Sequence, residues 1–277
     1  ANCKSSTKKS TATTTITTTI TAKNSTVPSS IADDDFAIPI KIYTSSSENH
    51  QPTRAAVLFI HGGVFHDGDC NSHPTIANGL ANLGLVVITA SFRNGKEAPH
   101  KSNITNLDLK DVVDYIQKTW KNLPFGIVGS SSGGFFALTL SQSLGPSIVK
   151  FCIPICPVAD PFKRASYLRS SISGSAKSDG YNIHHDVAKS RQILSKQLSF
   201  WKDDDSMQEA GGSLSNPKHR NIPTLMIIGS VDKNVPFSVT ADVQTLATRT
   251  IVIGGKGHEI CDKLIDEEGG GYHCYLH

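Results

Sequence analysis

Residues 125–134 of this chain read FGIVGSSSGG, and this stretch decides the fold. It predicts a short strand, a sharp turn and an apolar helix, and the turn matches the pattern G-x-S-x-G. In such a turn a nucleophilic serine adopts a strained backbone conformation, and side chains two positions before and after it would collide. Both positions therefore favour glycine. Of the three consecutive serines, only Ser131 has glycine at both positions, Gly129 and Gly133, so Ser131 is the predicted nucleophile.

Patterns typical of strands and helices alternate on both sides of this turn. Apolar runs at residues 55–60 and 85–90 suit central strands of a parallel sheet. Further strands are expected at residues 36–42, 125–129, 148–155, 223–229 and 250–253. Helices are expected near residues 76–83, 109–120, 133–140 and 238–246, with Thr105 and Asp108 as a capping pair before the second of them. Repeated units of this size predict an α/β fold with a doubly wound, mostly parallel sheet.

A glycine pair follows the apolar run at residues 55–60. An acyl-transfer enzyme must stabilise an oxyanion with preorganised donors, each contributing about 3–4 kcal/mol to lowering the barrier. Glycines allow backbone N–H groups to approach the reacting atoms closely. The N–H groups of Gly62 or Gly63, together with that of Ser132, are the predicted oxyanion hole. His61, directly before the pair, is expected to pack and hydrogen-bond beneath the loop.

An acid and a base follow two later strands. Asp232 comes after the apolar run at residues 223–229, and His258 follows the predicted strand at residues 250–253. The carboxyl ends of parallel strands meet at one edge of a sheet, where ligands and catalytic groups gather. We therefore predict that Ser131 is the nucleophile, that His258 is the general base, and that Asp232 orients the imidazole.

With these motifs in the order Ser131, Asp232, His258, the chain resembles the α/β-hydrolase superfamily. Within it, the sequence is similar to the esterase and lipase branch that includes hormone-sensitive-lipase-like carboxylesterases. The resemblance covers about residues 36–270. It implies a carboxylesterase that acts on a small-molecule ester through an acyl-enzyme, with no metal and no cofactor. One departure is Val64, which stands where that branch usually has a third glycine.

Two segments break the strand and helix pattern. Residues 1–30 are rich in Ser and Thr and predict a disordered tail or an edge strand, and residues 31–277 are expected to form the hydrolase domain. Residues 161–220 lack a good core strand and are interpreted as a cap insertion over the site. The expected substrate-binding residues are Val64, Phe65, Ser130 and Trp201. Aromatic residues in a cap also commonly form a small core of their own.

Composition excludes several kinds of partner. The formal net charge is +3, and no segment concentrates Lys and Arg, so no nucleic-acid partner is expected. No apolar run approaches 18 residues, so no membrane span is expected. The absence of a secretory signal favours a cytoplasmic location, and a secreted protein is the alternative if a leader has been removed. Oligomeric state is left open.

Cysteine and histidine patterns do not predict a metal centre. The chain has six cysteines and no CxxC pair, and Cys152 and Cys156 lie in an apolar run as expected buried thiols. A polar cluster after the glycine pair superficially resembles a metal site. Its members, His66, Asp67, Asp69, Cys70 and His73, lack a fixed ligand spacing, so metal binding is not expected there.

Several alternative functions fit the same motifs. An amidase, a formamidase or a peptidase would use the same three residues, and so would an esterase that acts on acylated carbohydrates. A non-catalytic ligand receptor on this fold is a further alternative, because fold does not fix function. Such receptors often lack a member of the triad, whereas all three residues are present here. A phosphate-binding loop at residues 129–134 is disfavoured, because the loop lacks the lysine of a P-loop.

Overall fold

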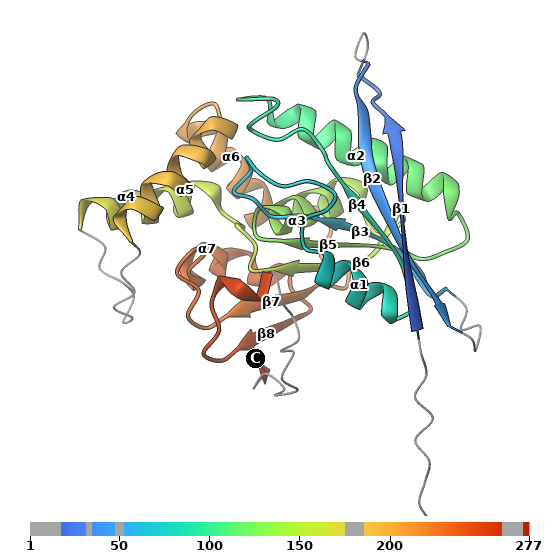
Figure 1. Cartoon of the computed structure of the whole chain (residues 1–277). Helices are drawn as coiled ribbons and strands as arrows, with labels where there is room; N and C mark the ends of the chain where they lie inside the picture. The colour runs from blue at the N-terminus through green and yellow to red at the C-terminus, as the bar shows by residue number, and fades with distance from the viewer. Residues whose placement is uncertain (1–17, 32–34, 48–52, 175–185, 262–273, 277) are drawn as a thin grey trace, which may run out of the picture.

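The structure is a computed structural model, which describes residues 18–31, 35–47, 53–174, 186–261 and 274–276. Its strands are β1 (Thr18–Pro28), β2 (Ala37–Ser47), β3 (Ala55–Ile60), β4 (Leu85–Ala90), β5 (Phe125–Ser130), β6 (Val149–Ile155), β7 (Leu225–Gly229), β8 (Arg249–Ile253) and β9 (Cys274–Leu276). Within the described residues they form one sheet in the order β1-β2-β4-β3-β5-β6-β7-β8-β9 (Figure 1). The strands from β4 to β8 in this order run parallel, whereas β1, β2 and β9 join antiparallel at the two edges. The predicted mostly parallel α/β sheet is thus confirmed.

Helices cover both faces of this sheet. They are α1 (Pro74–Asn82), α2 (Ser102–Thr119), α3 (Ser132–Leu144), α4 (Pro161–Ser173), α5 (Val187–Phe200), α6 (Asp204–Ser215) and the short α7 (Phe237–Thr240). Two 3₁₀ segments, Ala241–Leu246 and His258–Cys261, follow later in the chain. The described helices do not include one that is long and apolar enough to cross a membrane.

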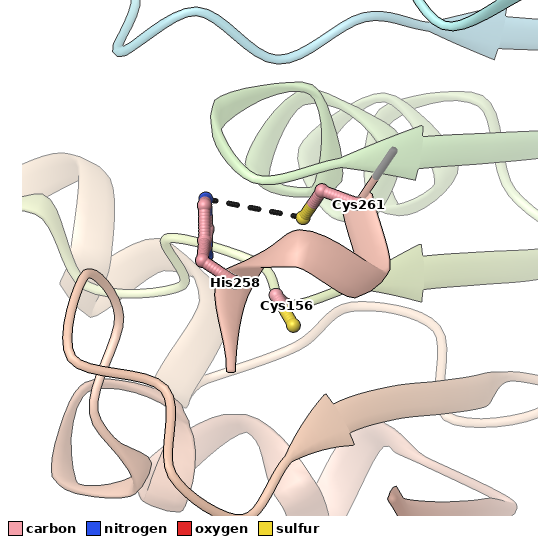
Figure 2. Close-up of side chains that lie close together, drawn as sticks. All are labelled: Cys156, His258 and Cys261. Carbon is pink, nitrogen blue, oxygen red and sulfur yellow. Dashed lines mark hydrogen bonds between the residues drawn. The ribbon is translucent and has the colours of Figure 1, made fainter. Parts of the chain in front are cut away.

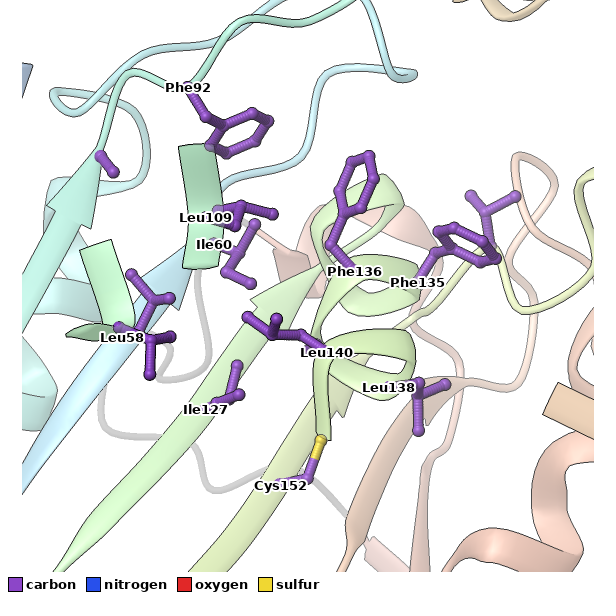
Figure 3. Close-up of a cluster of buried hydrophobic side chains, with 14 of the residues drawn as sticks. Leu58, Ile60, Phe92, Leu109, Ile127, Phe135, Phe136, Leu138, Leu140 and Cys152 are labelled. Atoms are coloured by element: carbon purple, nitrogen blue, oxygen red, sulfur yellow. The ribbon is translucent and has the colours of Figure 1, made fainter. Parts of the chain in front are cut away.

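Successive side chains of the central strands point to opposite faces of the sheet, so the buried residues form two clusters, one on each face. Leu58 and Ile60 of β3 pack in the larger cluster with residues of α2 and α3, as Figure 3 shows. Their neighbours Val57 and Phe59 point to the opposite face and pack with residues of α1. Because the central strands are covered on both sides, most of their residues are apolar, as expected for parallel strands.

The segment at residues 161–220 contributes α4, α5 and α6. Each of these helices begins with an aspartate whose carboxylate accepts a hydrogen bond from a backbone N–H of the first turn. The caps are Asp160, Asp186 and Asp203, with hydrogen bonds of 2.9, 2.8 and 2.8 Å. Such caps satisfy N–H groups that have no partner inside the helix. The helices also pack together, with α4 in contact with both α5 and α6.

The N-terminal segment forms a long edge strand in its described part. Strand β1 pairs with β2 along its full length, from Thr18 opposite Ser47 to Pro28 opposite Ala37. Val27 of β1 is buried in the larger cluster. Residues 1–17 of the predicted tail lie outside the described residues. The strand therefore depends on pairing with β2, a long-range contact that composition does not reveal.

The capping prediction for the second helix is wrong. Helix α2 begins at Ser102, so Thr105 and Asp108 lie inside it. The fully buried Asp108 instead accepts hydrogen bonds of 2.9 Å from the backbone N–H and from Nε of Arg93. Thr105 donates its hydroxyl to the carbonyl of Arg93. A tertiary ion pair explains these residue types, and the local capping pattern matched by coincidence.

The sequence predicts a strand at residues 250–253 with none after it, and one helix near residues 238–246. Strand β9 instead follows β8 and extends the sheet edge. The expected helix is divided into α7 and the 3₁₀ segment Ala241–Leu246.

The larger cluster yields a stability prediction. Phe136 of α3 is 2% exposed and makes edge-on contacts with the rings of Phe65, Phe92 and Phe200. Phe136→Ala is expected to lower the free energy of unfolding by about 3–5 kcal/mol, because the cavity cannot collapse fully. The matched control is Phe237→Ala at a site that is 58% exposed, with an expected change within about 0.5 kcal/mol. Urea unfolding measures both, and equal losses would contradict this description of the core.

Candidate active site

The predicted nucleophile occupies a strained turn between β5 and α3. Ser131 has φ 54° and ψ −119°, a conformation that L-residues rarely adopt. The residues two positions before and after Ser131 must be glycine. A Cβ at Gly129 would lie 2.1 Å from the carbonyl oxygen of Gly133, and a Cβ at Gly133 would lie 2.1 Å from the carbonyl oxygen of Ile60. The Ser131 N–H donates to the carbonyl of Ile155 at 2.8 Å. Packing thus holds the turn in place from both sides.

The structure brings Ser131, His258 and Asp232 together in a hydrogen-bonded chain. The Nδ1 atom of His258 lies 2.7 Å from Oδ2 of Asp232, and its Nε2 lies 2.9 Å from the hydroxyl oxygen of Ser131. An ionised carboxylate can only accept, so Nδ1–H donates to Asp232 and Nε2 is left to accept from Ser131. This is the tautomer that a general base for Ser131 requires.

A close approach of two loops places the acid beside the base. A Cβ at Gly229, the last residue of β7, would lie 2.5 Å from the carbonyl oxygen of Lys256, in the loop that precedes His258. The N–H of Val231 donates to the same carbonyl at 3.0 Å. Glycine at the end of β7 therefore lets the loop after β8 come close enough for Asp232 to reach the imidazole.

The carboxylate of Asp232 is buried, and protein groups donate hydrogen bonds to both of its oxygens. Its Oδ1 accepts hydrogen bonds of 2.8 Å from the backbone N–H groups of Asn234 and Val235. Burial opposes ionisation, but the hydrogen bond from His258, its charge and these two donors outweigh burial, so the pKa of Asp232 lies below its ordinary value of 3.8. The group is an anion at neutral pH.

The pKa of His258 moves in the other direction. Burial disfavours the imidazolium, but the hydrogen bond to Asp232 and the charge of that carboxylate outweigh burial and raise the pKa of His258 above its ordinary value of 6.5. The free base forms as pH rises through this elevated pKa. Proton acceptance from Ser131 is therefore expected to strengthen above neutral pH.

The glycine loop lies against the nucleophile. Gly62 is so close that a Cβ there would be 3.1 Å from Cβ of Ser131. Its N–H donates to Nε2 of His73 at 3.4 Å, a long hydrogen bond. The N–H groups of Gly63 and Ser132 find no acceptor in the part of the chain that the structure describes. Of the three predicted donors, these two are the ones available to an oxyanion without rearrangement.

The remaining residues of this loop are structural in character. His61 is buried, donates from Nδ1 to the carbonyl of Gly62 at 2.7 Å, and stacks on Phe92 at 4.4 Å between ring centroids. Burial lowers the pKa of His61 to about 4, so its ring is neutral. Val64 has φ 61°, in the left-handed region that a glycine would adopt without strain.

The predicted substrate-binding residues have different surroundings. Phe65 and Trp201 pack against each other at 5.6 Å in a cluster of aromatic rings that joins α3 to the end of α5. Ser130 is fully buried, and its hydroxyl has no hydrogen-bond partner among the described residues. Val64 is partly exposed. Contact of these four residues with substrate stays a prediction.

Sequence reasoning missed Arg164, a fully buried cation on α4. Its Nε and one terminal nitrogen donate to the backbone oxygen of Asn234 at 3.1 Å and to the side-chain oxygen of Asn234 at 2.5 Å. The other terminal nitrogen donates to the side chain of Gln197 at 3.2 Å. No carboxylate lies within ion-pair distance of Arg164 in the described ranges. Because Asn234 donates to Asp232, Arg164 holds the loop that carries the acid.

The metal-like cluster after the glycine pair does not converge. His66 pairs with Asp67, which also binds Lys196 of α5. The side chain of His73 instead accepts the N–H of Gly62. The described residues of this cluster do not bring three ligand atoms together.

Comparison with known proteins identifies the family of this chain. A family model described as the alpha/beta hydrolase fold matches residues 57–231. The chain belongs to the α/β-hydrolase family. This α/β-hydrolase is 23% identical over 256 residues to an ethyl acetate hydrolase of Pseudomonas putida, a match that covers 86% of this chain and 76% of that protein.

Two further similarities extend the comparison. A shorter match to the neuroligin-like protein glit-1 of Caenorhabditis elegans, 45% identical over 49 residues, covers 18% of this α/β-hydrolase and only 6% of that protein. Among solved structures, the hyperthermophilic esterase from the archaeon Pyrobaculum calidifontis shares the fold with a TM-score of 0.64. The two are 20% identical, and the match covers 90% of this chain and 79% of the esterase.

The raised pKa of His258 can be tested in solution. An NMR titration of the imidazole is expected to have its midpoint above 6.5. Asp232→Asn is expected to lower the midpoint, because it removes the negative charge that offsets the effect of burial on the pKa of His258. The control is Asp242→Asn, which removes a carboxylate whose side chain is 49% exposed and paired with Lys163. The same midpoint in wild type and Asp232→Asn would contradict this electrostatic account.

Arg164 yields a second prediction. Arg164→Met leaves the acceptors of Asn234 and Gln197 without donors, each at about 1–3 kcal/mol, so the free energy of unfolding should fall by at least about 2 kcal/mol. Arg169→Met is the control, because Arg169 forms an exposed ion pair with Asp204 of about 0–1 kcal/mol. Urea unfolding compares them, and a loss for Arg164→Met no greater than the control's would show that these hydrogen bonds contribute little.

Proposed function

We propose that this α/β-hydrolase is a carboxylesterase that acts through an acyl-enzyme. The observation that carries the proposal is the continuous hydrogen-bonded chain from Asp232 through His258 to the hydroxyl of Ser131. Next to this chain lie two backbone N–H groups, of Gly63 and Ser132, without acceptors among the described residues. Acyl transfer needs a nucleophile, an oriented base and backbone donors for an oxyanion, and these two N–H groups are the candidates for the donors.

In the first half of the reaction, Ser131 attacks the ester carbonyl carbon while Nε2 of His258 takes the hydroxyl proton. The negative charge that develops on the carbonyl oxygen is stabilised by the N–H groups of Gly63 and Ser132. Asp232 stabilises the imidazolium without taking its proton. His258 then gives the proton to the leaving alcohol, and the acyl group stays on Ser131.

In the second half, water replaces the alcohol. His258 accepts a proton from water, the resulting hydroxide attacks the acyl carbon, and the acid leaves as Ser131 regains its proton. The ethyl acetate hydrolase and the archaeal esterase to which the chain is similar support an ester substrate over an amide.

We also propose that α4, α5 and α6 act as the cap over the site. Two contacts support this role. Lys196 of α5 pairs with Asp67 of the loop that follows the glycine pair, and Arg164 of α4 binds the loop after Asp232. The cap is thus attached to the loops that carry both the predicted oxyanion hole and the acid. Phe65 and Trp201, which join α5 to the core, remain the predicted pocket walls.

Turnover of p-nitrophenyl acetate and butyrate tests the proposal. Ser131→Ala is expected to lower kcat by at least about 10⁴-fold, because no other group can form the acyl-enzyme. Ser132→Ala is the matched control, since it keeps the backbone N–H and should retain most activity. A fluorophosphonate probe should label wild type and Ser132→Ala but not Ser131→Ala.

Three outcomes would contradict parts of the proposal. Activity retained in Ser131→Ala and lost in Ser132→Ala would move the nucleophile by one residue. Turnover of anilides but not of esters would assign an amidase. A wild-type protein that neither hydrolyses esters nor reacts with the probe would favour a non-catalytic receptor.

A further inference from the structure

Two buried cysteines lie beside the imidazole of His258, and the proposed mechanism does not use them. His258 and Cys261 stand three residues apart in one 3₁₀ turn after β8, whereas Cys156 follows β6 (Figure 2). The sulfur of Cys261 lies 3.9 Å from Nε2 of His258. The ligand atoms of all three residues lie within 4.8 Å of one another. Segments about 100 residues apart in sequence thus bring two thiols and one imidazole together.

This ligand set has a defined chemical preference. Thiolate sulfur and imidazole nitrogen bind Zn²⁺ and other soft divalent cations, whereas Mg²⁺ and Ca²⁺ prefer oxygen ligands. Tetrahedral Zn²⁺ has bonds of about 2.3 Å to sulfur and about 2.0–2.1 Å to nitrogen, which places neighbouring ligand atoms about 3.5–3.8 Å apart. The distance of 3.9 Å between Cys261 and His258 is close to that range. Small side-chain rotations would complete the set.

The orientation of His258 also suits a metal ligand. In metal sites, a ligating histidine almost always donates its other ring N–H to a carboxylate or carbonyl, which fixes the tautomer. Asp232 has this position here, because it accepts from Nδ1 at 2.7 Å and leaves the lone pair on Nε2. The carboxylate that prepares the imidazole to accept a proton therefore prepares it equally to bind a cation.

We propose that Cys156, His258 and Cys261 form an inhibitory site for Zn²⁺ or a similar soft divalent cation. On binding, both thiols release their protons to solvent and coordinate as thiolates, and Nε2 gives its lone pair to the cation, with no change in oxidation state. The fourth position faces the hydroxyl of Ser131, which is 2.9 Å from Nε2. Since one lone pair cannot bind a cation and accept a proton, metal binding and general-base catalysis exclude each other.

Metal binding is tested first without catalysis. Ser131→Ala protein, freshly reduced, is titrated with Zn²⁺ by calorimetry and with Co²⁺ by absorption spectroscopy. One ion per chain is expected, with a thiolate-to-cobalt charge-transfer band, and Mg²⁺ should give neither signal. Adding Cys156→Ser or Cys261→Ser should weaken the band and lower Zn²⁺ affinity by at least about 10-fold. Cys152→Ser, at a buried thiol in β6 outside the cluster, should bind like the parent protein.

Inhibition is tested next on the active enzyme, and this step rests on the proposed function. Zn²⁺ should inhibit hydrolysis of p-nitrophenyl acetate reversibly, with activity restored by EDTA. In Cys261→Ser, the Zn²⁺ concentration for half inhibition, relative to the variant's own metal-free rate, should rise at least about 10-fold. Cys152→Ser should be inhibited like wild type.

The outcomes separate this proposal from the esterase proposal. Weak or non-stoichiometric Zn²⁺ binding by Ser131→Ala would overturn the metal site, and so would equal affinity in the parent, Cys156→Ser and Cys261→Ser proteins. A Zn²⁺ concentration for half inhibition that is the same in Cys261→Ser and wild type would place the inhibitory cation elsewhere and also overturn the proposal. One tightly bound ion in a wild-type protein without esterase activity would instead contradict the proposed function and leave the site intact.

Discussion

The backbone at Ser131 is the constraint on which the rest of the site depends. A φ of 54° is unfavourable for serine, and it persists because the turn is fixed by the surrounding structure. Gly129 and Gly133 pack so closely against other backbone that no larger residue fits at either position. The turn places the hydroxyl of Ser131 2.9 Å from Nε2 of His258. The predicted nucleophile and Ser132, a predicted oxyanion donor, are therefore adjacent residues of one turn.

The other parts of the site are brought to this turn by long-range contacts. Gly229 lets the loops that carry Asp232 and His258 approach each other, and Arg164 fixes the first of these loops from the side of the cap. Burying a guanidinium away from any carboxylate within ion-pair distance in the described residues is unfavourable by itself. Its hydrogen bonds to Asn234 and Gln197 offset that cost and link α4, α5 and the acid loop into one network.

Under the two proposals, base catalysis and metal binding compete for the imidazole of His258. Its Nδ1–H is committed to Asp232, so every function of the ring passes through Nε2. Ser131 lies on one side of this atom at 2.9 Å, and Cys261 lies on another at 3.9 Å. The same carboxylate that raises proton affinity also raises affinity for a soft cation. The proposed inhibition by a soft cation therefore acts on the same nitrogen atom as the proposed base catalysis.

The sequence by itself determined the parallel sheet, because apolar strands and helical stripes report burial through local periodicity. It also predicted the turn at Ser131, since the steric need for glycine on both sides is local. It also predicted Asp232 and His258, because each follows an apolar strand and the carboxyl ends of parallel strands meet at one sheet edge. Tertiary structure decided several other features. These features join segments that are distant in sequence: the choice of an edge strand over a disordered tail for residues 18–28, the role of Asp108 as the partner of Arg93, the burial of Arg164 and the approach of Cys156 to His258. No periodicity or short motif records such pairings, because their energy comes from contacts that exist only once the chain has folded.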